Sequence, residues 1–66
     1  MASEESFATI KKQLESNGWS LTRINGSHHI FTKPNRMPIS IPVHRGKVKN
    51  VYARKVDKII EQDRND

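Results

Sequence analysis

Two turn signals in the middle of the chain separate three short runs that have the side-chain alternation of β-strands. Asn25-Gly26 is the strongest two-residue hairpin signal, because both central positions of a type I′ turn need a positive φ. In Lys33-Pro34-Asn35-Arg36, the proline presets φ at the first central position of a second turn. The runs predicted as strands cover residues 19–24, 27–32 and 37–43. Since such short connections join neighbouring strands, the predicted sheet is antiparallel.

An amphipathic helix is predicted on each side of these strands. The first, near residues 4–16, has apolar residues at helical spacing and ends at the stop signal Asn17-Gly18. The second starts at Asn50, which is able to cap it. The apolar positions are Phe7, Ile10 and Leu14 in the first helix and Tyr52, Val56, Ile59 and Ile60 in the second, and Ser3 or Ser6 is the candidate cap of the first.

The predicted order is α-β-β-β-α, an α+β arrangement like that of double-stranded-RNA-binding domains. Two helices cover only one face of a three-stranded antiparallel sheet, so the other face stays open to water or to a partner. Pro42 cannot donate a ladder hydrogen bond, so we expect the third strand to lie at an edge of the sheet or to end irregularly. We predict a single domain over residues 1–66, with residues 1–3 and 63–66 frayed.

The chain is short for a fold without a covalent cross-link. A 66-residue chain buries about 60% of the surface that its unfolded form exposes, and it has no cysteine for a disulfide or a thiolate metal site. No apolar run approaches the roughly 20 residues that cross a bilayer, and the acidic, polar start MASEESF does not resemble a signal peptide. These features argue against a multidomain enzyme, a membrane protein or a disulfide mini-protein, and we expect a cytoplasmic location.

Charge is unevenly distributed along the chain. Twelve Lys and Arg stand against seven Asp and Glu, yet residues 16–56 hold eight basic residues and no acidic one. A surface with one sign of charge favours a polyanion, and nucleic acid is the commonest polyanion of a cytoplasm. A solvated basic surface and an acidic protein partner are the alternatives. Because the carboxylates lie only in the terminal segments, they argue against a two-metal nuclease site.

Three histidines are the candidates for acid–base chemistry, because an imidazole titrates near neutral pH. His28 and His29 are adjacent on a predicted strand, so they point to opposite faces and cannot chelate one zinc ion. The two-residue turn predicts that Arg23 pairs with His28 on the helix-facing side of the sheet. Phe31 is then a candidate for stacking on a base from the open face. On these residues alone, a packing or surface role for each histidine stays open.

A set of motifs resembles the HicA toxin family, the small mRNA interferases of bacterial type II toxin–antitoxin systems. The resemblance covers residues 14–60. Its motifs are Gly18-Trp19, then Gly26-Ser27-His28-His29-Ile30-Phe31, then a proline turn, then Ile41-Pro42-Val43-His44.

The resemblance implies a double-stranded-RNA-binding-domain-like fold and an endoribonuclease that uses no metal or other cofactor. It also implies a catalytic histidine in the Gly-Ser-His position, which here is His28 and not His29, and a HicB antitoxin that covers the active surface. The chain departs from the family at Lys49-Asn50-Val51-Tyr52, where members often have a Pro-Gly-Thr-like turn.

We therefore expect His28 to deprotonate a ribose 2′-hydroxyl of mRNA, whose oxygen attacks the adjacent phosphorus. Nearby cations stabilise the charge that develops on the phosphoryl oxygens, and His44 or water protonates the leaving oxygen. The residues expected to bind RNA are Arg23, Lys33, Arg45, Lys47 and Lys49. Two alternatives remain: a non-catalytic RNA-binding module of the same fold, and a protein-interaction domain for an acidic partner.

Overall fold

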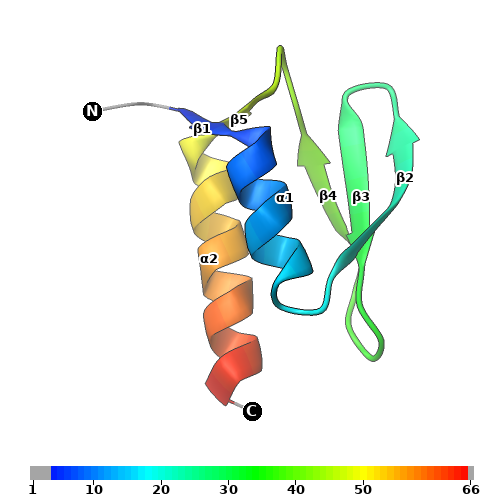
Figure 1. Ribbon diagram of the computed structural model, residues 1–66, viewed down its shortest axis with the longest axis vertical. Coiled ribbons are helices and arrows are strands. Elements are labelled where there is room, and N and C mark those ends of the chain that lie inside the picture. Colours follow the sequence, from blue (N-terminus) through cyan, green and yellow to red (C-terminus); the bar gives the residue numbers. More distant parts are fainter. Residues whose placement is uncertain (1–3, 66) are drawn as a thin grey trace.

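The computed structural model describes residues 4–65 and has two helices on one face of an antiparallel sheet. The three-stranded sheet has the order β2-β3-β4, and a second pair, β1-β5, lies over the helix ends (Figure 1). This confirms the predicted fold and adds two short strands to it. The elements are β1 (Glu4–Ser6), α1 (Phe7–Glu15), β2 (Ser20–Asn25), β3 (His28–Thr32), β4 (Ile39–Pro42), β5 (Lys47–Lys49) and α2 (Asn50–Asn65).

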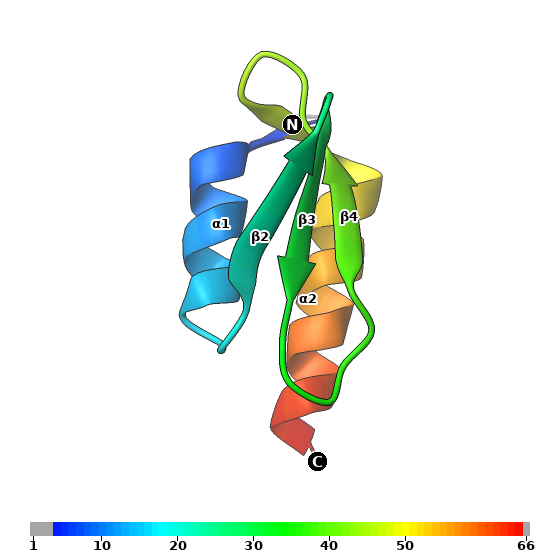
Figure 2. The same cartoon turned by 90° about the vertical axis from the view of Figure 1, so that its right-hand side faces the viewer.

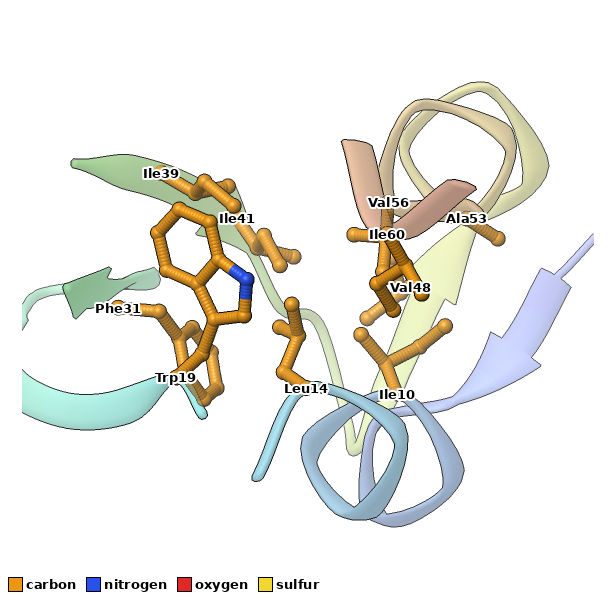
Figure 3. Close-up of a cluster of buried hydrophobic side chains, with 10 residues drawn as sticks. All are labelled: Ile10, Leu14, Trp19, Phe31, Ile39, Ile41, Val48, Ala53, Val56 and Ile60. Carbon is orange, nitrogen blue, oxygen red and sulfur yellow. The ribbon is translucent and has the colours of Figure 1, made fainter. Parts of the chain in front are cut away.

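The core lies between the helices and one face of the sheet, as Figure 3 shows. Both helices and strands β3, β4 and β5 contribute apolar residues to it, and Phe31, Leu14 and Val48 are completely buried. Pro42 lies on the edge strand β4, as predicted. The full set is Ile10, Leu14, Trp19, Phe31, Ile39, Ile41, Val48, Ala53, Val56 and Ile60.

The start of the chain corrects one prediction. The first helix begins at Phe7 and not near residue 4, because Glu4–Ser6 pair with Lys47–Lys49 as strands. Ser6 is the N-cap residue, but its side chain makes no capping hydrogen bond. Instead the Phe7 amide donates to the Gly46 carbonyl at 2.9 Å, which satisfies one of the free amides of the first turn.

The predicted basic loop before α2 is a tight hairpin. His44 and Lys47 exchange two backbone hydrogen bonds of 2.9 and 3.0 Å. The central residues Arg45 and Gly46 have φ of 53° and 76°, the signs that a type I′ turn requires. This turn starts β5, the strand to which β1 adds.

The β2–β3 hairpin turns one residue later than predicted. Its two-residue loop is Gly26-Ser27, and only Gly26 has a positive φ, as in a type II′ turn. The shifted loop alone makes Arg23 pair with Ile30, so the predicted pairing of Arg23 with His28 is wrong. Farther from the turn, a β-bulge between Leu21 and Arg23 changes the register by one residue, so that Leu21 pairs with Phe31.

The turn between β3 and β4 forms where the sequence predicts it. The Arg36 amide donates to the Lys33 carbonyl at 3.1 Å, and Asn35 has φ 66°. Proline at the first central position and a positive φ at the second are features of a type II turn.

Helix α2 continues to Asn65, so residues 63–65, placed in a frayed tail by sequence, are helical. The candidate cap Ser3 and the other terminal residues 1, 2 and 66 lie outside the described part of the chain. Within residues 4–65, neither helix is long and apolar enough to cross a membrane.

Candidate active site on the open face of the sheet

Figure 2 shows the face of the sheet that the helices leave uncovered. His28 lies at the start of the central strand β3 and belongs to this face. Its ladder partners are Asn25 on β2 and Pro42 on β4. Directly paired residues share a face, and the His28 side chain is exposed there. The expectation that it lies on the helix-facing side is wrong, because the bulge places Leu21 on the opposite face of the sheet from Arg23 and His28.

Ser40 on β4 is the hydrogen-bonding partner of His28. Its Oγ lies 3.2 Å from Nδ1 of the imidazole. Ser40 pairs with Ile30, two residues along β3 from His28, so the serine and the histidine are diagonal neighbours on the open face. Nε2 of the same ring has no hydrogen-bond partner among the described residues and is the nitrogen available to a substrate. Sequence reasoning missed Ser40, and its only signal was its place on the polar side of an alternating strand.

His29 has the opposite environment. Its ring lies on the helix-facing side with its centroid 4.5 Å from that of Phe7, and its Nδ1 is 3.2 Å from the Ser27 carbonyl oxygen. This ring is half-buried and is held by packing on α1. Phe31 shares that face and is fully buried, so the prediction that it stacks on a base from the open face is wrong.

One predicted RNA-binding residue lies on the open face itself. Arg23 is exposed on β2 and pairs with Ile30, the neighbour of His28 along the same face of β3. Its side chain therefore lies on the same face of the sheet as the imidazole of His28.

Three more of these residues belong to the hairpin at the same end of the sheet. Arg45 occupies its turn, and Lys47 and Lys49 are exposed on either side of the buried Val48. The Val43 amide donates to the Ser27 carbonyl at 2.7 Å, which ties this hairpin to the β2–β3 turn directly before His28. Figure 2 shows both turns at one end of the molecule. The turn that carries Arg45 thus lies beside the turn before His28, whereas Lys47 and Lys49 lie on β5, which pairs with β1 in a separate sheet.

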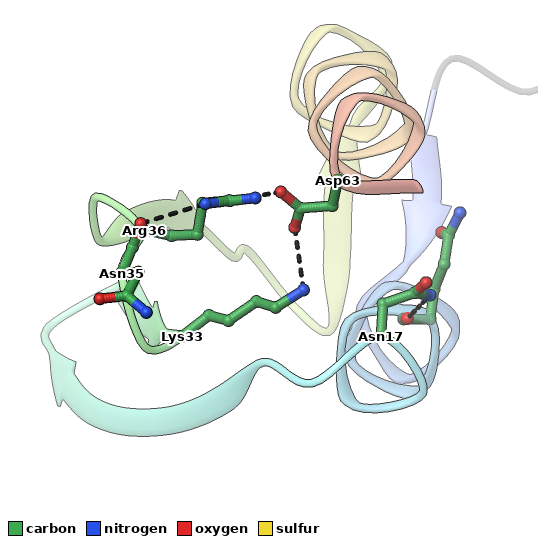
Figure 4. A network of polar contacts seen from close by, with 6 residues as sticks. Asn17, Lys33, Asn35, Arg36 and Asp63 are labelled. Carbon is green, nitrogen blue, oxygen red and sulfur yellow. Dashed lines mark hydrogen bonds and ion pairs between the residues drawn. The ribbon is translucent and has the colours of Figure 1, made fainter. Parts of the chain in front are cut away.

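Lys33 is not brought to this end. It follows β3 at the opposite end of the strand, and its Nζ lies 3.1 Å from Oδ2 of Asp63 (Figure 4). Nε of Arg36 lies 2.6 Å from the other oxygen of the same carboxylate. The hydrogen bonds from Arg36 and from Lys33 hold the pKa of the Asp63 carboxyl below its ordinary value. This cluster fastens the end of α2 to the β3–β4 turn.

Within residues 4–65, no three His, Cys, Asp or Glu side chains converge in the way that ligands of a metal ion do. The open face carries the imidazole of His28 with the hydroxyl of Ser40 beside it. Strands β2, β3 and β4 contain no Asp or Glu at all.

Comparison with known proteins gives one match. A family model described as the HicA toxin of bacterial toxin–antitoxin matches residues 7–63, which is most of the chain. No curated protein and no solved structure matches. The matched region contains α1, all but the last two residues of α2, the three-stranded sheet and every residue of the site described above.

Proposed function

This chain belongs to the HicA toxin family, the toxins of bacterial toxin–antitoxin pairs, and we propose that it is an mRNA endoribonuclease that uses His28 as its general base and needs no metal ion. The observation that carries the proposal is the position of His28. It is exposed on the uncovered face of the sheet, its Nδ1 is engaged by Ser40, and its Nε2 faces no protein partner among residues 4–65.

The proposed reaction is an attack by the RNA on itself. Nε2 of His28 takes the proton of a ribose 2′-hydroxyl, and the 2′-oxygen forms a bond to the adjacent phosphorus. The bond from phosphorus to the 5′-oxygen breaks, and that oxygen takes a proton from His44 or from water. The products are a 2′,3′-cyclic phosphate and a free 5′-hydroxyl. All atoms come from the RNA, so the step needs no co-reactant.

The basic residues have two roles in this proposal. Arg23, which shares the open face with His28, is the candidate to stabilise the negative charge on the phosphoryl oxygens as the new bond forms. Lys47 and Lys49 lie on β5, away from that face, so we assign them, with Arg23 and Arg45, to holding the RNA backbone, a contact that is sensitive to salt because it releases counterions. Lys33 has its charge offset by Asp63, so we assign it the smallest share of RNA binding.

The proposed partner is a HicB-type antitoxin that neutralises the toxin in the cytoplasm by covering the open face. Two helices and the β1-β5 pair all lie away from that face (Figures 1 and 2). A protein that docks there excludes RNA from His28 without any change in the fold of the toxin.

The chemistry is tested with three matched oligonucleotides. One is all-RNA, the second has a 2′-deoxy sugar at the scissile position, and the third has that sugar at a position that is not cut. We expect the first and third to be cleaved in EDTA, with a cyclic phosphate end, and the second to resist.

Loss of cleavage in EDTA, or cleavage of the second oligonucleotide, would contradict the proposed reaction. Salt-dependent binding of all three without any cleavage would identify the chain as a non-catalytic RNA-binding module.

A further inference from the structure

We propose that Ser40 is a positioning residue that keeps the proton of His28 on Nδ1, so that Nε2 carries the lone pair that accepts the ribose proton. This inference rests on the proposed function, in which His28 is the base. Its evidence is the 3.2 Å separation of Ser40 Oγ and His28 Nδ1 on the open face.

The backbone fixes this contact. His28 and Ser40 both lie within strands of one ladder, β3 and β4, and not in a loop. Diagonal side chains on neighbouring strands lie within reach of a ring and a hydroxyl. The contact therefore sets the orientation of the ring relative to the sheet, which matters because a misplaced base loses catalytic efficiency.

The role proposed for Nε2 selects one direction for this hydrogen bond. A neutral imidazole has one nitrogen that donates and one that accepts, and only the form with its proton on Nδ1 is a base at Nε2. Ser40 is exposed, so its own proton is free to donate to water while its oxygen accepts from Nδ1. When Nε2 takes the ribose proton, both ring nitrogens donate, and the serine oxygen still accepts.

His29 supplies an internal reference for this state. Its Nδ1 lies 3.2 Å from the carbonyl oxygen of Ser27, a group that only accepts hydrogen bonds. A neutral His29 in this contact therefore has its proton on Nδ1. If Ser40 acts as proposed, His28 and His29 share one tautomer although they point to opposite faces.

The test compares Ser40→Val with Ser40→Thr, two β-branched side chains of almost equal shape that differ in the hydroxyl. Both suit a strand, and the site is exposed, so each variant is expected to fold. Ser20→Ala, on β2 beyond Leu21, removes an exposed serine far from His28 and is the matched control. The first readout is the ¹⁵N chemical shifts of the histidine ring nitrogens at a pH at which the rings are neutral.

We expect His28 and His29 to show the same tautomer in the wild type, in Ser40→Thr and in Ser20→Ala. Ser40→Val is expected to move His28 toward the form with its proton on Nε2 and to lower kcat about tenfold with KM unchanged, the effect of losing one hydrogen bond to a group that becomes charged.

An unchanged His28 tautomer in Ser40→Val overturns the proposal, and so does a changed tautomer with an unchanged kcat. A wild-type chain that does not cleave RNA refutes the proposed function instead, and the nitrogen shifts then still decide whether Ser40 sets the tautomer.

Discussion

At the scale of single residues, two adjacent histidines have different roles because a strand alternates its side chains. His28 points to the open face and meets a hydroxyl, whereas His29 points to the helices and packs on Phe7. The same alternation separates Phe31, which is completely buried, from Ile30, which is half-buried on the open face. Substitutions of His29 and Ile30 therefore serve as controls for substitutions of His28 and Phe31.

The first prediction concerns Phe31. We expect Phe31→Ala to lower the free energy of unfolding by about 3–5 kcal/mol, because it removes a fully buried ring and leaves a cavity. Ile30→Ala, which removes a half-buried side chain from the other face, is expected to cost less. Urea denaturation followed by circular dichroism measures both. If Phe31→Ala keeps its stability and loses only RNA affinity, Phe31 is a stacking residue and its assignment to the core is wrong.

At this scale the sequence is enough to propose a base but not to predict its surroundings. His28 stands in a recognisable Gly-Ser-His motif, so a local pattern is enough to single it out. Ser40 lies twelve residues away, and which face His28 occupies depends on the register of a neighbouring strand. The bulge between Leu21 and Arg23 reverses that assignment, and it is not visible in a period-2 pattern.

At the scale of elements, the hairpin before α2 contains backbone strain. Arg45 has φ 53°, a region that costs a side chain such as arginine about 1–2 kcal/mol and that asparagine tolerates better. Strain that persists at a candidate binding residue suggests that the side chain is kept for its charge.

The second prediction follows from this strain. Arg45→Asn is expected to raise the free energy of unfolding by up to about 1 kcal/mol and to weaken RNA binding, with the salt slope reduced by about 1. Arg45→Gln removes the charge without relieving the backbone, so it is expected to lose the affinity and not to gain the stability. Urea denaturation and RNA binding titrations at several salt concentrations measure both. An unchanged salt slope in both variants would show that Arg45 contacts no phosphate.

The third prediction concerns the link between α2 and the β3–β4 turn. Arg36 and Lys33 lower the pKa of Asp63, so the folded state binds the Asp63 proton less tightly than the unfolded chain. The stabilisation is therefore fully present above the usual aspartate value of about 3.9 and is lost as the pH falls below it.

Thermal unfolding of the wild type and of Asp63→Asn between pH 7 and pH 2 measures this effect. We expect the variant to have the lower Tm at pH 7 and the two Tm values to converge in acid. Glu61→Gln, at an exposed position on the same helix, is the control and is expected to leave the difference small at every pH. A gap between wild type and Asp63→Asn that stays constant down to pH 2 would contradict the assignment.

The long elements are predictable from sequence, and the short ones are not. Both helices and the three main strands follow from apolar periodicity and turn signals. Strand β1 does not, because Glu4 and Glu5 also suit the first turn of a helix. Their strand conformation depends on pairing with Lys47–Lys49, more than forty residues away. A pairing between segments so far apart in the sequence leaves no pattern in the residues of either segment alone.

At the scale of the whole molecule, the residues that stabilise the fold and those of the proposed reaction lie on opposite faces of the sheet. The helix-facing side of the sheet carries the apolar core, and the open side carries His28, Ser40 and Arg23. Substitutions on the open side thus leave the core intact, which makes the site unusually suitable for mutational tests. The family match to residues 7–63 covers both sides.

The central claim, that His28 is the general base, is tested most directly by the single-turnover rate of RNA cleavage by His28→Ala. Circular dichroism and RNA affinity are measured on the same samples, and His29→Gln is the control for loss of a neighbouring imidazole. For His28→Ala we predict a fall in rate of about 10²–10⁴-fold, with fold and RNA affinity retained. For folded His29→Gln we predict a rate near that of wild type. A rate for His28→Ala within a few-fold of wild type would contradict the central claim.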